Sequence, residues 1–342
     1  MLFHRLTVAE VVQETEEARS YALAVPEALL PSFRYRAGQH LTFRVNVDGE
    51  ILTRSYSLSS APESRGLPVV TVKRIAQGRV SNWFHRSVSA GTVLEVSEPA
   101  GRFVCDVGDE SDAPLLFCAA GSGITPVLSM IRSALATTGR VMTLFYANRD
   151  AGSTIFRDVI AGLADEYPHR LAVIRHYDDE HGFPDATVLE GLLSRPTGFQ
   201  LYLCGPAPFM ATVRTAAAAA GVPDGRVHLE HFDAAPQGSA AQAFPAGDGH
   251  ACDAHVMTKG ARHVVRVNAG QSLLQAALAE GLDVPYACEE GYCGSCAAKC
   301  LDGEIVHACN DVFNADELAA GWILTCQAHP RQDRPITITY DV

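Results

Sequence analysis

Four cysteines near the C-terminal end have a spacing that suits iron–sulfur chemistry. They follow the pattern C-x4-C-x2-C with a fourth cysteine after a gap: Cys288, Cys293, Cys296 and Cys326. This is the spacing of plant-type [2Fe–2S] ligation, in which thiolates from one tight loop and one distant thiolate surround two irons. Gly291 and Gly294 would let that loop turn and point its N–H groups at the sulfides. Zinc prefers paired C-x2-C units or Cys/His sets, and only one such pair occurs, so we favour the cluster.

The other cysteines near this group fit no ligand spacing. Six of the ten cysteines lie within residues 288–326 of a long chain without an export signal, which favours metal ligation over a disulfide framework. Cys300 and Cys309 lie among them, whereas Cys105, Cys118 and Cys252 are scattered elsewhere. Because unliganded cysteine is among the most buried residue types, we expect these side chains to be buried.

A cation, an aromatic ring and hydroxyl groups occur close together on a predicted strand. They belong to Arg54, Ser55, Tyr56 and Ser57, a set that suits a cofactor with both a phosphate and an aromatic ring. An ordinary strand with a solvated arginine is the alternative. Farther along, Gly78 to Ser81 precede a predicted helix over residues 82–88. Ser81 and the N–H groups of this helix suit a pyrophosphate, or Ser81 is a simple N-cap.

Two glycine-containing turns follow apolar strands in the middle of the chain. Gly121-Ser122-Gly123-Ile124-Thr125-Pro126 comes after LLFCAA, and Cys204-Gly205-Pro206 ends the strand FQLYLC. The first turn is not the full G-x-G-x-x-G fingerprint, and a tight turn without a ligand would use the same glycines. In an open α/β sheet, however, ligands bind beyond the carboxyl ends of the strands. We expect the two turns to face one another across a nicotinamide.

The elements that position these groups change character along the chain. Apolar and polar residues alternate over residues 1–108, which predicts an antiparallel β-barrel. Strands alternate with helices over residues 109–232, which predicts an α/β domain with a parallel sheet. Residues 233–249 are rich in Ala, Gly, Pro and Gln without periodicity and are expected to form a linker. Residues 250–342 are expected to form a compact α+β unit that holds the cysteines.

Composition excludes several classes of function. The 342 residues are 47% hydrophobic and 19% charged, and no apolar run approaches the ~18 residues of a membrane span. We therefore expect a cytoplasmic protein without a membrane partner. The net charge of −12 disfavours nucleic acid as a partner. Neither an H-E-x-x-H metal motif nor a G-x-S-x-G elbow occurs, so a hydrolase is not indicated.

Taken together, these motifs resemble the ferredoxin–NADP reductase superfamily, in the arrangement that carries a plant-type ferredoxin domain of β-grasp fold at its C-terminus. The motifs occur in the family's order, and the resemblance covers nearly the whole chain. The matching residues are Arg54-x-Tyr56-Ser57, Gly78-x-x-Ser81, Pro99-x-Gly101-x-Phe103, Gly121-x-Gly123-x-Thr125-Pro126, Cys204-Gly205-Pro206, Glu230-x-Phe232 and the cysteine loop. One departure is His307-Ala308-Cys309, where relatives usually have an acidic residue and a methionine.

The resemblance implies roles for individual residues. Arg54 would bind the flavin phosphate, Tyr56 would pack on the isoalloxazine, and Ser57 would hydrogen-bond near its N5. Ser59-Ser60 stand where the FMN-binding phthalate dioxygenase reductases typically have Cys-Asn, which favours FAD. Thr125 and Cys204 would flank the nicotinamide C4, and Glu230 and Phe232 would lie on the far side of the flavin pocket. The remaining residues expected to bind cofactors are Ser55, Val72, Lys73, Gly78, Val80, Ser81, Gly121, Gly123, Asn148, Arg149, Gly205 and Pro206.

The choice of electron donor depends on what meets the ribose 2′ position, expected around Asn148, Arg149 and Ser153. Arg149 suits the 2′-phosphate of NADPH, or it is simply solvated. No acidic residue ends the preceding strand, although Asp150 follows closely. The sequence therefore permits NADH or NADPH, and we favour NADH.

By the same resemblance, the chain would take hydride from NAD(P)H onto FAD and pass single electrons through the [2Fe–2S] cluster. The acceptor would be the separate component of a Rieske or di-iron oxygenase, and the reductase itself would be a monomer. A reductase for a hybrid-cluster protein is one alternative, because it shares this domain order. A non-catalytic electron-transfer or sensing module is another, although the intact glycine turns argue against it.

Overall fold

The computed structural model describes residues 2–105, 113–193, 198–232, 250–286, 289, 291, 294–310, 312–313 and 315–342. The chain divides into two compact units, Leu2–Phe232 and Asp233–Val342. The expected boundary between residues 108 and 109 and the expected linker 233–249 lie outside the described residues. No helix in the described part of the chain is both long enough and apolar enough to cross a membrane.

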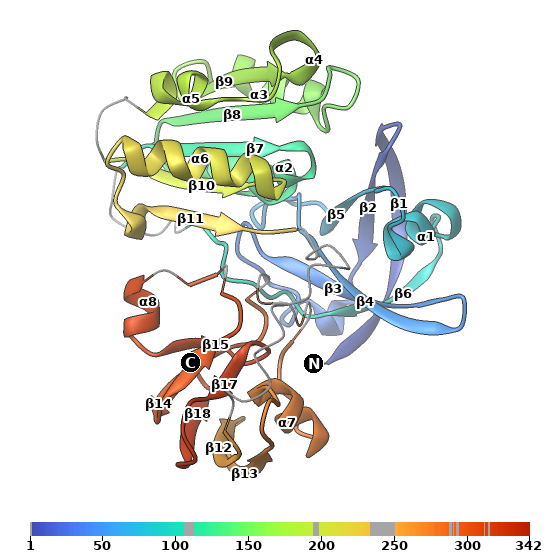
Figure 1. Ribbon diagram of the computed structural model, residues 1–342. Coiled ribbons are helices and arrows are strands. Elements are labelled where there is room, and N and C mark those ends of the chain that lie inside the picture. The colour runs from blue at the N-terminus through green and yellow to red at the C-terminus, as the bar shows by residue number, and fades with distance from the viewer. Residues whose placement is uncertain are drawn as a thin grey trace. The chain divides into compact units, whose positions relative to one another are not determined.

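The first unit begins with an antiparallel sheet that closes into a barrel (Figure 1). Its strand order is β4-β3-β6-β1-β2-β5, and a bridge between Leu58 and Val70 joins the two edges. Strand β3 shows why the sheet forms, because Leu41, Phe43 and Val45 alternate inward into one apolar core. The strands are β1 (Phe3–Thr15), β2 (Ala18–Ala24), β3 (His40–Val47), β4 (Glu50–Ser57), β5 (Val69–Lys73) and β6 (Val93–Ser97).

One helix, α1 (Arg79–Ser87), fills an end of this core, and a short 3-10 turn, η1 (Glu27–Leu29), lies between β2 and β3. The buried ring of Phe84 on α1 meets the rings of Tyr21, Phe43 and Tyr56 edge-on or nearly so, with centroids 5.3 Å away in each case. Such T-shaped pairs are favourable. They fix α1 against the strand that carries the predicted flavin residues.

The first unit ends with a five-stranded parallel sheet in the order β11-β10-β7-β8-β9 (Figure 1). Its strands are β7 (Leu115–Ala120), β8 (Met142–Asn148), β9 (Leu171–Tyr177), β10 (Gln200–Cys204) and β11 (Val227–Glu230). The helical segments are η2 (Gly121–Gly123), α2 (Ile124–Thr137), α3 (Arg157–Glu166), α4 (Asp178–His181), α5 (Ala186–Leu193), α6 (Ala207–Ala219) and η3 (Asp224–Arg226).

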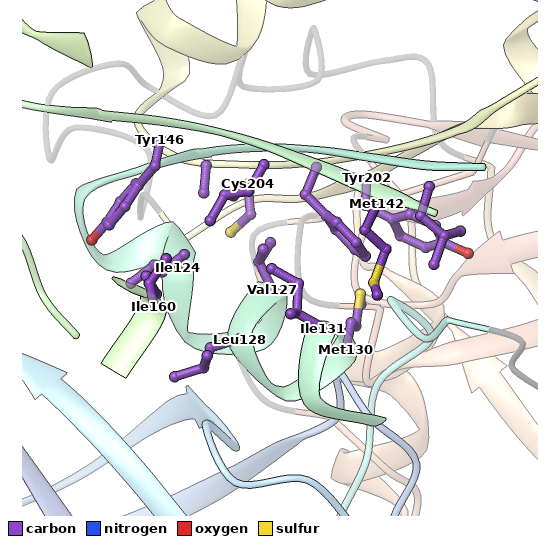
Figure 2. Close-up of a cluster of buried hydrophobic side chains, with 14 of the residues drawn as sticks. Ile124, Val127, Leu128, Met130, Ile131, Met142, Tyr146, Ile160, Tyr202 and Cys204 are labelled. Carbon is purple, nitrogen blue, oxygen red and sulfur yellow. The ribbon is translucent and has the colours of Figure 1, made fainter. Parts of the chain in front are cut away.

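Helices cover both faces of this sheet, and its central strand β7 is apolar and buried throughout. In β7, Leu115 and Phe117 face a core shared with α2 and α3, whereas Leu116 and Cys118 face a core shared with α5 and α6. Figure 2 shows the first of these cores, with Ile131 of α2 among the labelled residues. This two-sided burial is what a parallel sheet requires.

Helix α2 is also hydrogen-bonded to the barrel. Ser129 Oγ donates to the carbonyl oxygen of Ser60 at 2.6 Å, and Ser133 Oγ donates to the carboxylate of Glu63 at 2.8 Å. Both serines are buried. The barrel and the parallel sheet therefore share a polar seam inside one compact unit.

The second unit is an α+β fold built on a mixed sheet in the order β13-β12-β18-β14-β16. β12 and β18 run parallel, and their other neighbours run antiparallel. Helix α7 begins with a capping box between Ser272 and Gln275. The elements are β12 (Cys252–Thr258), β13 (Ala261–Val267), α7 (Leu273–Ala279), β14 (Ala297–Asp302), β15 (Ile305–His307), α8 (Ala315–Ala319), β16 (Trp322–Leu324), β17 (Ala328–Pro330) and β18 (Ile336–Thr339). The expected sequence of barrel, parallel sheet and ferredoxin-like fold is confirmed.

Candidate functional site

Strand β4 places the predicted flavin residues at the edge of the barrel core. Tyr56 is partly buried against Phe84, and burial raises the pKa of its phenol, which therefore stays neutral. Ser55 shares a hydrogen bond of 2.9 Å with Thr42 on β3. Arg54 is exposed, and its guanidinium donates to the carbonyl oxygen of Thr53. A neutral ring beside an exposed cation suits an aromatic cofactor with a phosphate tail.

Three buried polar side chains meet next to this strand. Ser57 Oγ donates to Glu230 Oε2 at 3.3 Å, and His40 Nδ1 lies 3.9 Å from Glu230 Oε1. His40 comes into place because it pairs with Ser57 across β3 and β4. Burial raises the pKa of the Glu230 carboxyl, an effect that His40 and Ser57 partly offset. Sequence reasoning identified Ser57 and Glu230 but missed His40, whose only signal was this strand pairing.

The predicted phosphate helix starts earlier than the sequence suggested. α1 begins at Arg79 with Gly78 as its N-cap, so Ser81 lies in the first turn and is not the cap. Ser81 Oγ donates to the carbonyl oxygen of Gly78 at 3.4 Å. A Cβ at Gly78 would lie 2.4 Å from that hydroxyl oxygen, so a larger residue would require the Ser81 side chain to move. Arg79 and Asn82 line a cavity of about 220 Å³ at this helix end, whose N–H groups favour an anion.

The strand before this helix reaches towards the nucleotide loop. Lys73 ends β5, and its ammonium lies 3.6 Å from the position that a Cβ on Gly121 would take. It also lies 4.0 Å from the Glu17 carboxylate. Val72 and Val80, both expected to bind cofactor, have side chains buried in the barrel core. Lys73 therefore joins the predicted flavin region to the first glycine turn.

The two glycine turns meet at the carboxyl edge of the parallel sheet. β7 and β10 are neighbours, and a Cβ on Gly123 would lie 2.1 Å from the carbonyl oxygen of Cys204. A Cβ on Gly205 would lie 2.9 Å from the Cβ of Ala120. Gly121 has a φ of 53°, a left-handed value that favours glycine. The adjacency of the two turns is as expected.

The two residues expected to flank the nicotinamide are both buried. Thr125 Oγ1 donates to the carbonyl oxygen of Ser122 at 3.0 Å, which fixes the first turn. The side chain of Cys204 points towards α2 and packs in the core with Val127 (Figure 2). The backbone of Cys204, rather than its thiol, therefore forms the contact with the glycine turn. Pro206 follows as the N-cap of α6, and Phe232 is partly buried against the same core.

Polar groups without partners gather at the ends of β8 and β9. Neither amide atom of Asn148 has a hydrogen-bond partner among the described residues, although both are buried. The same holds for Asp178 Oδ1, at the end of the adjacent β9. Arg149 is exposed, and its guanidinium contacts the carboxylates of Asp150 at 3.0 Å and Glu17 at 3.8 Å. Because buried polar atoms are normally satisfied, this edge fits a hydroxyl-rich ligand such as the ribose of a dinucleotide.

The second unit brings together two of the predicted cluster ligands. Cys296 and Cys326 are both buried, and their Sγ atoms lie 3.3 Å apart, well beyond the ~2.05 Å of a disulfide bond. Gly291 and Gly294 have φ values of 88° and 69°, which confirms their predicted role in turning the loop. The other two predicted ligands, Cys288 and Cys293, lie outside the described residues. One thiol from the loop and one from a distant segment, converging in this way, fit a [2Fe–2S] cluster.

The remaining cysteines divide into two groups. Cys105, Cys118 and Cys252 are buried, as expected. The expectation is wrong for Cys300 and Cys309, which are partly exposed. Cys300 lies on β14 at the border of the core of the second unit, and its thiol contacts the carbonyl oxygen of Asp302 at 3.5 Å.

Three family models match the chain in the order of these sites. An oxidoreductase FAD-binding domain matches residues 5–105, and an oxidoreductase NAD-binding domain matches residues 117–215. A 2Fe-2S iron-sulfur cluster binding domain matches residues 256–331. The expected cofactors FAD, NAD and [2Fe–2S] are thereby confirmed.

Known proteins of the same length match the chain throughout. The 3-ketosteroid-9-alpha-monooxygenase ferredoxin reductase component of Rhodococcus rhodochrous is 41% identical, with 96% of this chain and 94% of that protein covered. A component of the 1,2-phenylacetyl-CoA epoxidase of Escherichia coli K12 is 39% identical, with 96% and 95% covered. The structure of phthalate dioxygenase reductase aligns over 98% of both chains with a TM-score of 0.61 and 28% identity. The chain therefore belongs to the family of oxygenase reductase components that join an FAD-binding domain, an NAD-binding domain and a C-terminal [2Fe–2S] domain.

Proposed function

We propose that this reductase component oxidises NADH and delivers electrons, one at a time, to a separate Rieske or di-iron oxygenase component. The observation that carries the proposal is the meeting of Ser57 and Glu230 with the glycine turns in one compact unit. FAD, held by residues such as Arg54 and Tyr56, would supply the conversion of a two-electron hydride donation into single-electron transfers to the cluster. The protein has to bind, orient and shield these groups.

Ser57, Glu230 and His40 are proposed to handle the proton that accompanies this chemistry. The hydroxyl of Ser57 is expected to lie near N5 of the flavin. Glu230 orients this hydroxyl by accepting a hydrogen bond from it. The raised pKa of Glu230, caused by burial, suits a carboxyl that holds a proton more readily than an exposed one. His40 lies next to Glu230 and offers the proton a way onward.

The preference for NADH is proposed from the end of β9. The buried Oδ1 of Asp178 has no hydrogen-bond partner among the described residues. It suits a hydrogen bond donated by the 2′-hydroxyl of the ribose. The same carboxylate would repel a 2′-phosphate. The sequence offered no acidic residue at the end of β8, but Asp178, the first residue of α4, directly follows the neighbouring strand β9.

The acceptor is proposed from the relatives. The two named above belong to a 3-ketosteroid monooxygenase and a phenylacetyl-CoA epoxidase, and the acceptor is accordingly proposed to be a separate oxygenase component. Reconstitution with candidate oxygenase components, with product formation as the readout, selects between a steroid and an aromatic thioester. Electron transfer to a hybrid-cluster protein in place of any oxygenase would overturn this assignment.

An anaerobic titration with NADH and then NADPH tests the donor half of the proposal. Flavin and iron–sulfur absorbance are followed together in the purified protein. Bleaching of the flavin followed by the cluster is the expected result, at a lower concentration of NADH than of NADPH. A flavin that stays oxidised with both nucleotides would mean a passive electron-transfer or sensing module. The variant Cys326→Ser is the control, because its flavin should still bleach without a cluster signal.

We also propose that the protein is a monomer in the cytoplasm. Cys118, Cys252 and Cys300 are thiols, which suits a reducing compartment. Sedimentation of the purified protein tests the oligomeric state, and fractionation of cells tests the compartment. A dimer in the first experiment, or recovery outside the cytoplasm in the second, would contradict the respective statement.

A further inference from the structure

The residues on either side of Cys326 both reach back to the ligand loop. Thr325 precedes this cysteine, and its Oγ1 donates to the carbonyl oxygen of Cys296 at 3.0 Å. The backbone N–H of Thr325 donates to the same oxygen at 3.2 Å. Gln327 follows the cysteine, and its Nε2 donates to the carbonyl oxygen of Glu289 at 2.8 Å. Residues 325–327 are therefore hydrogen-bonded to the loop at two places, at Glu289 near its start and at Cys296 at its end.

The loop has a conformation that needs such support. Glu289 has a φ of 58°, a left-handed value that is unfavourable for a residue with a side chain. Gly291 also has a left-handed φ, and a Cβ there would lie 2.9 Å from Cγ of Gln327. The side chain of Gln327 therefore packs directly over the turn whose backbone it also binds.

Both clamping side chains are buried and held in place from behind. Thr325 has no exposed surface, and Gln327 is 7% exposed. Tyr340 donates a hydrogen bond of 2.8 Å to Thr325 Oγ1. The hydroxyl proton of Thr325 is therefore available for its own hydrogen bond to the carbonyl oxygen of Cys296. Two hydrogen bonds fix the backbone of Gln327. Its N–H donates to the carbonyl oxygen of Leu324, and its carbonyl oxygen accepts from the N–H of Ala308. Side chains held in this way are preorganised, so they lose little conformational entropy when they bind the loop.

We propose that Thr325 and Gln327 are positioning residues that fix the backbone at Cys296 and Glu289 and thereby stabilise the bound cluster. The hydrogen bonds of Thr325 set the spacing between Cys326 and Cys296, and those of both residues control how long the cluster is retained. Outer-sphere hydrogen bonds orient metal ligands in this manner. The inference concerns the cluster alone and does not depend on the electron donor or acceptor.

Paired variants of the full-length protein test the proposal. Thr325→Val removes the hydroxyl at nearly constant shape, and Thr325→Ser retains it. Gln327→Met removes the amide donor but keeps an unbranched chain of similar size. Gln332→Glu is the control, because it alters a glutamine of the same unit outside the clamp. Iron content is referred to flavin content, since the flavin half belongs to the other compact unit and reports the amount of folded protein.

The readouts are the rate of iron release to a chelator and the EPR spectrum of the dithionite-reduced cluster. We expect Thr325→Val and Gln327→Met to lose iron about tenfold faster, the effect of one lost hydrogen bond, and to shift the EPR signal. Thr325→Ser and Gln332→Glu should behave as wild type. Iron release and EPR spectra that are unchanged in Thr325→Val and Gln327→Met would overturn the proposal. A failure of NADH to reduce the wild-type flavin would instead contradict the proposed function and leave this result standing.

Discussion

Ser57 and Glu230 are 173 positions apart in the sequence, yet their side chains form a buried hydrogen bond of 3.3 Å. Ser57 ends the barrel strand β4, and Glu230 ends β11 of the parallel sheet. The bond therefore lies where the two architectures of the first unit meet. It links the region expected to hold the flavin to the edge expected to hold the nicotinamide.

Removal of either partner should lower the rate of hydride transfer more than it lowers the affinity for NADH. We expect Ser57→Ala and Glu230→Gln each to reduce the rate of flavin reduction by roughly 100-fold, the usual contribution of a positioned acid–base group. Stopped-flow absorbance under anaerobic conditions measures this rate, and NADH concentration dependence gives the affinity. Because the residues act through one bond, the double variant should lose little more than either single variant. If the fold-losses of the two single variants multiply in the double variant, the two residues act independently.

The raised pKa of Glu230 gives the first unit a defined pH dependence of stability. A buried carboxyl with a raised pKa binds its proton more tightly in the folded than in the unfolded state. The free energy of unfolding should therefore fall as pH rises from 4.5, the ordinary value, through the raised pKa, by on the order of 1 kcal/mol per pH unit. Denaturant unfolding followed by flavin fluorescence measures the slope. Glu230→Gln should flatten the slope, and equal slopes in both proteins would rule out Glu230 as the cause.

Asp178 should control the choice between the two nicotinamide cofactors. We expect Asp178→Ala to raise kcat/KM for NADPH about tenfold, because a negative charge near the 2′-phosphate is removed. The value for NADH should fall, since the ribose loses an acceptor. Steady-state reduction of an artificial acceptor gives both constants. Asp179→Ala, the neighbouring acidic residue, is the matched control, and an equal change in that variant would argue against a specific role for Asp178.

Gly123 should tolerate no side chain. A Cβ there would lie 2.1 Å from the carbonyl oxygen of Cys204, so Gly123→Ala must push the two nucleotide turns apart. We expect a loss of about 2–3 kcal/mol in the free energy of unfolding and a weaker affinity for NADH. Gly139→Ala is the control, because a Cβ at that position meets nothing within 4 Å. Similar stabilities of the two variants in denaturant titrations would contradict the close approach.

Local spacing and periodicity predicted most of the fold and part of the site. The cysteine spacing alone indicated the cluster, and the left-handed Gly291 and Gly294 confirmed the turn that it requires. The role of His40 was not predictable, because it depends on strand register within β3 and β4. Asp178 was missed because it begins α4 directly after β9, the strand beside the expected one. Cys204 was placed on the correct edge, but strand alternation turns its thiol inward with Tyr202.

The start of α1 shows a different limit. Gly78, Arg79 and Val80 carry no side chain that caps a helix, so the sequence pointed to Ser81 as the N-cap. In the structure the helix begins at Arg79, and Val80 in its first turn is buried in the barrel core together with Phe84. Tertiary packing overrides local preference here.

The bonds from α2 to the barrel bear on how this protein can be recombined with others. Ser129 and Ser133 are buried, and both donate to the barrel segment that contains Ser60 and Glu63. Separation of the two architectures would expose or orphan these donors, at about 1–3 kcal/mol for each one left buried. The flavin and nicotinamide portions should therefore melt in a single cooperative transition. A productive chimera would inherit residues 2–232 as a block, and the exchangeable module would be the ferredoxin-like unit alone.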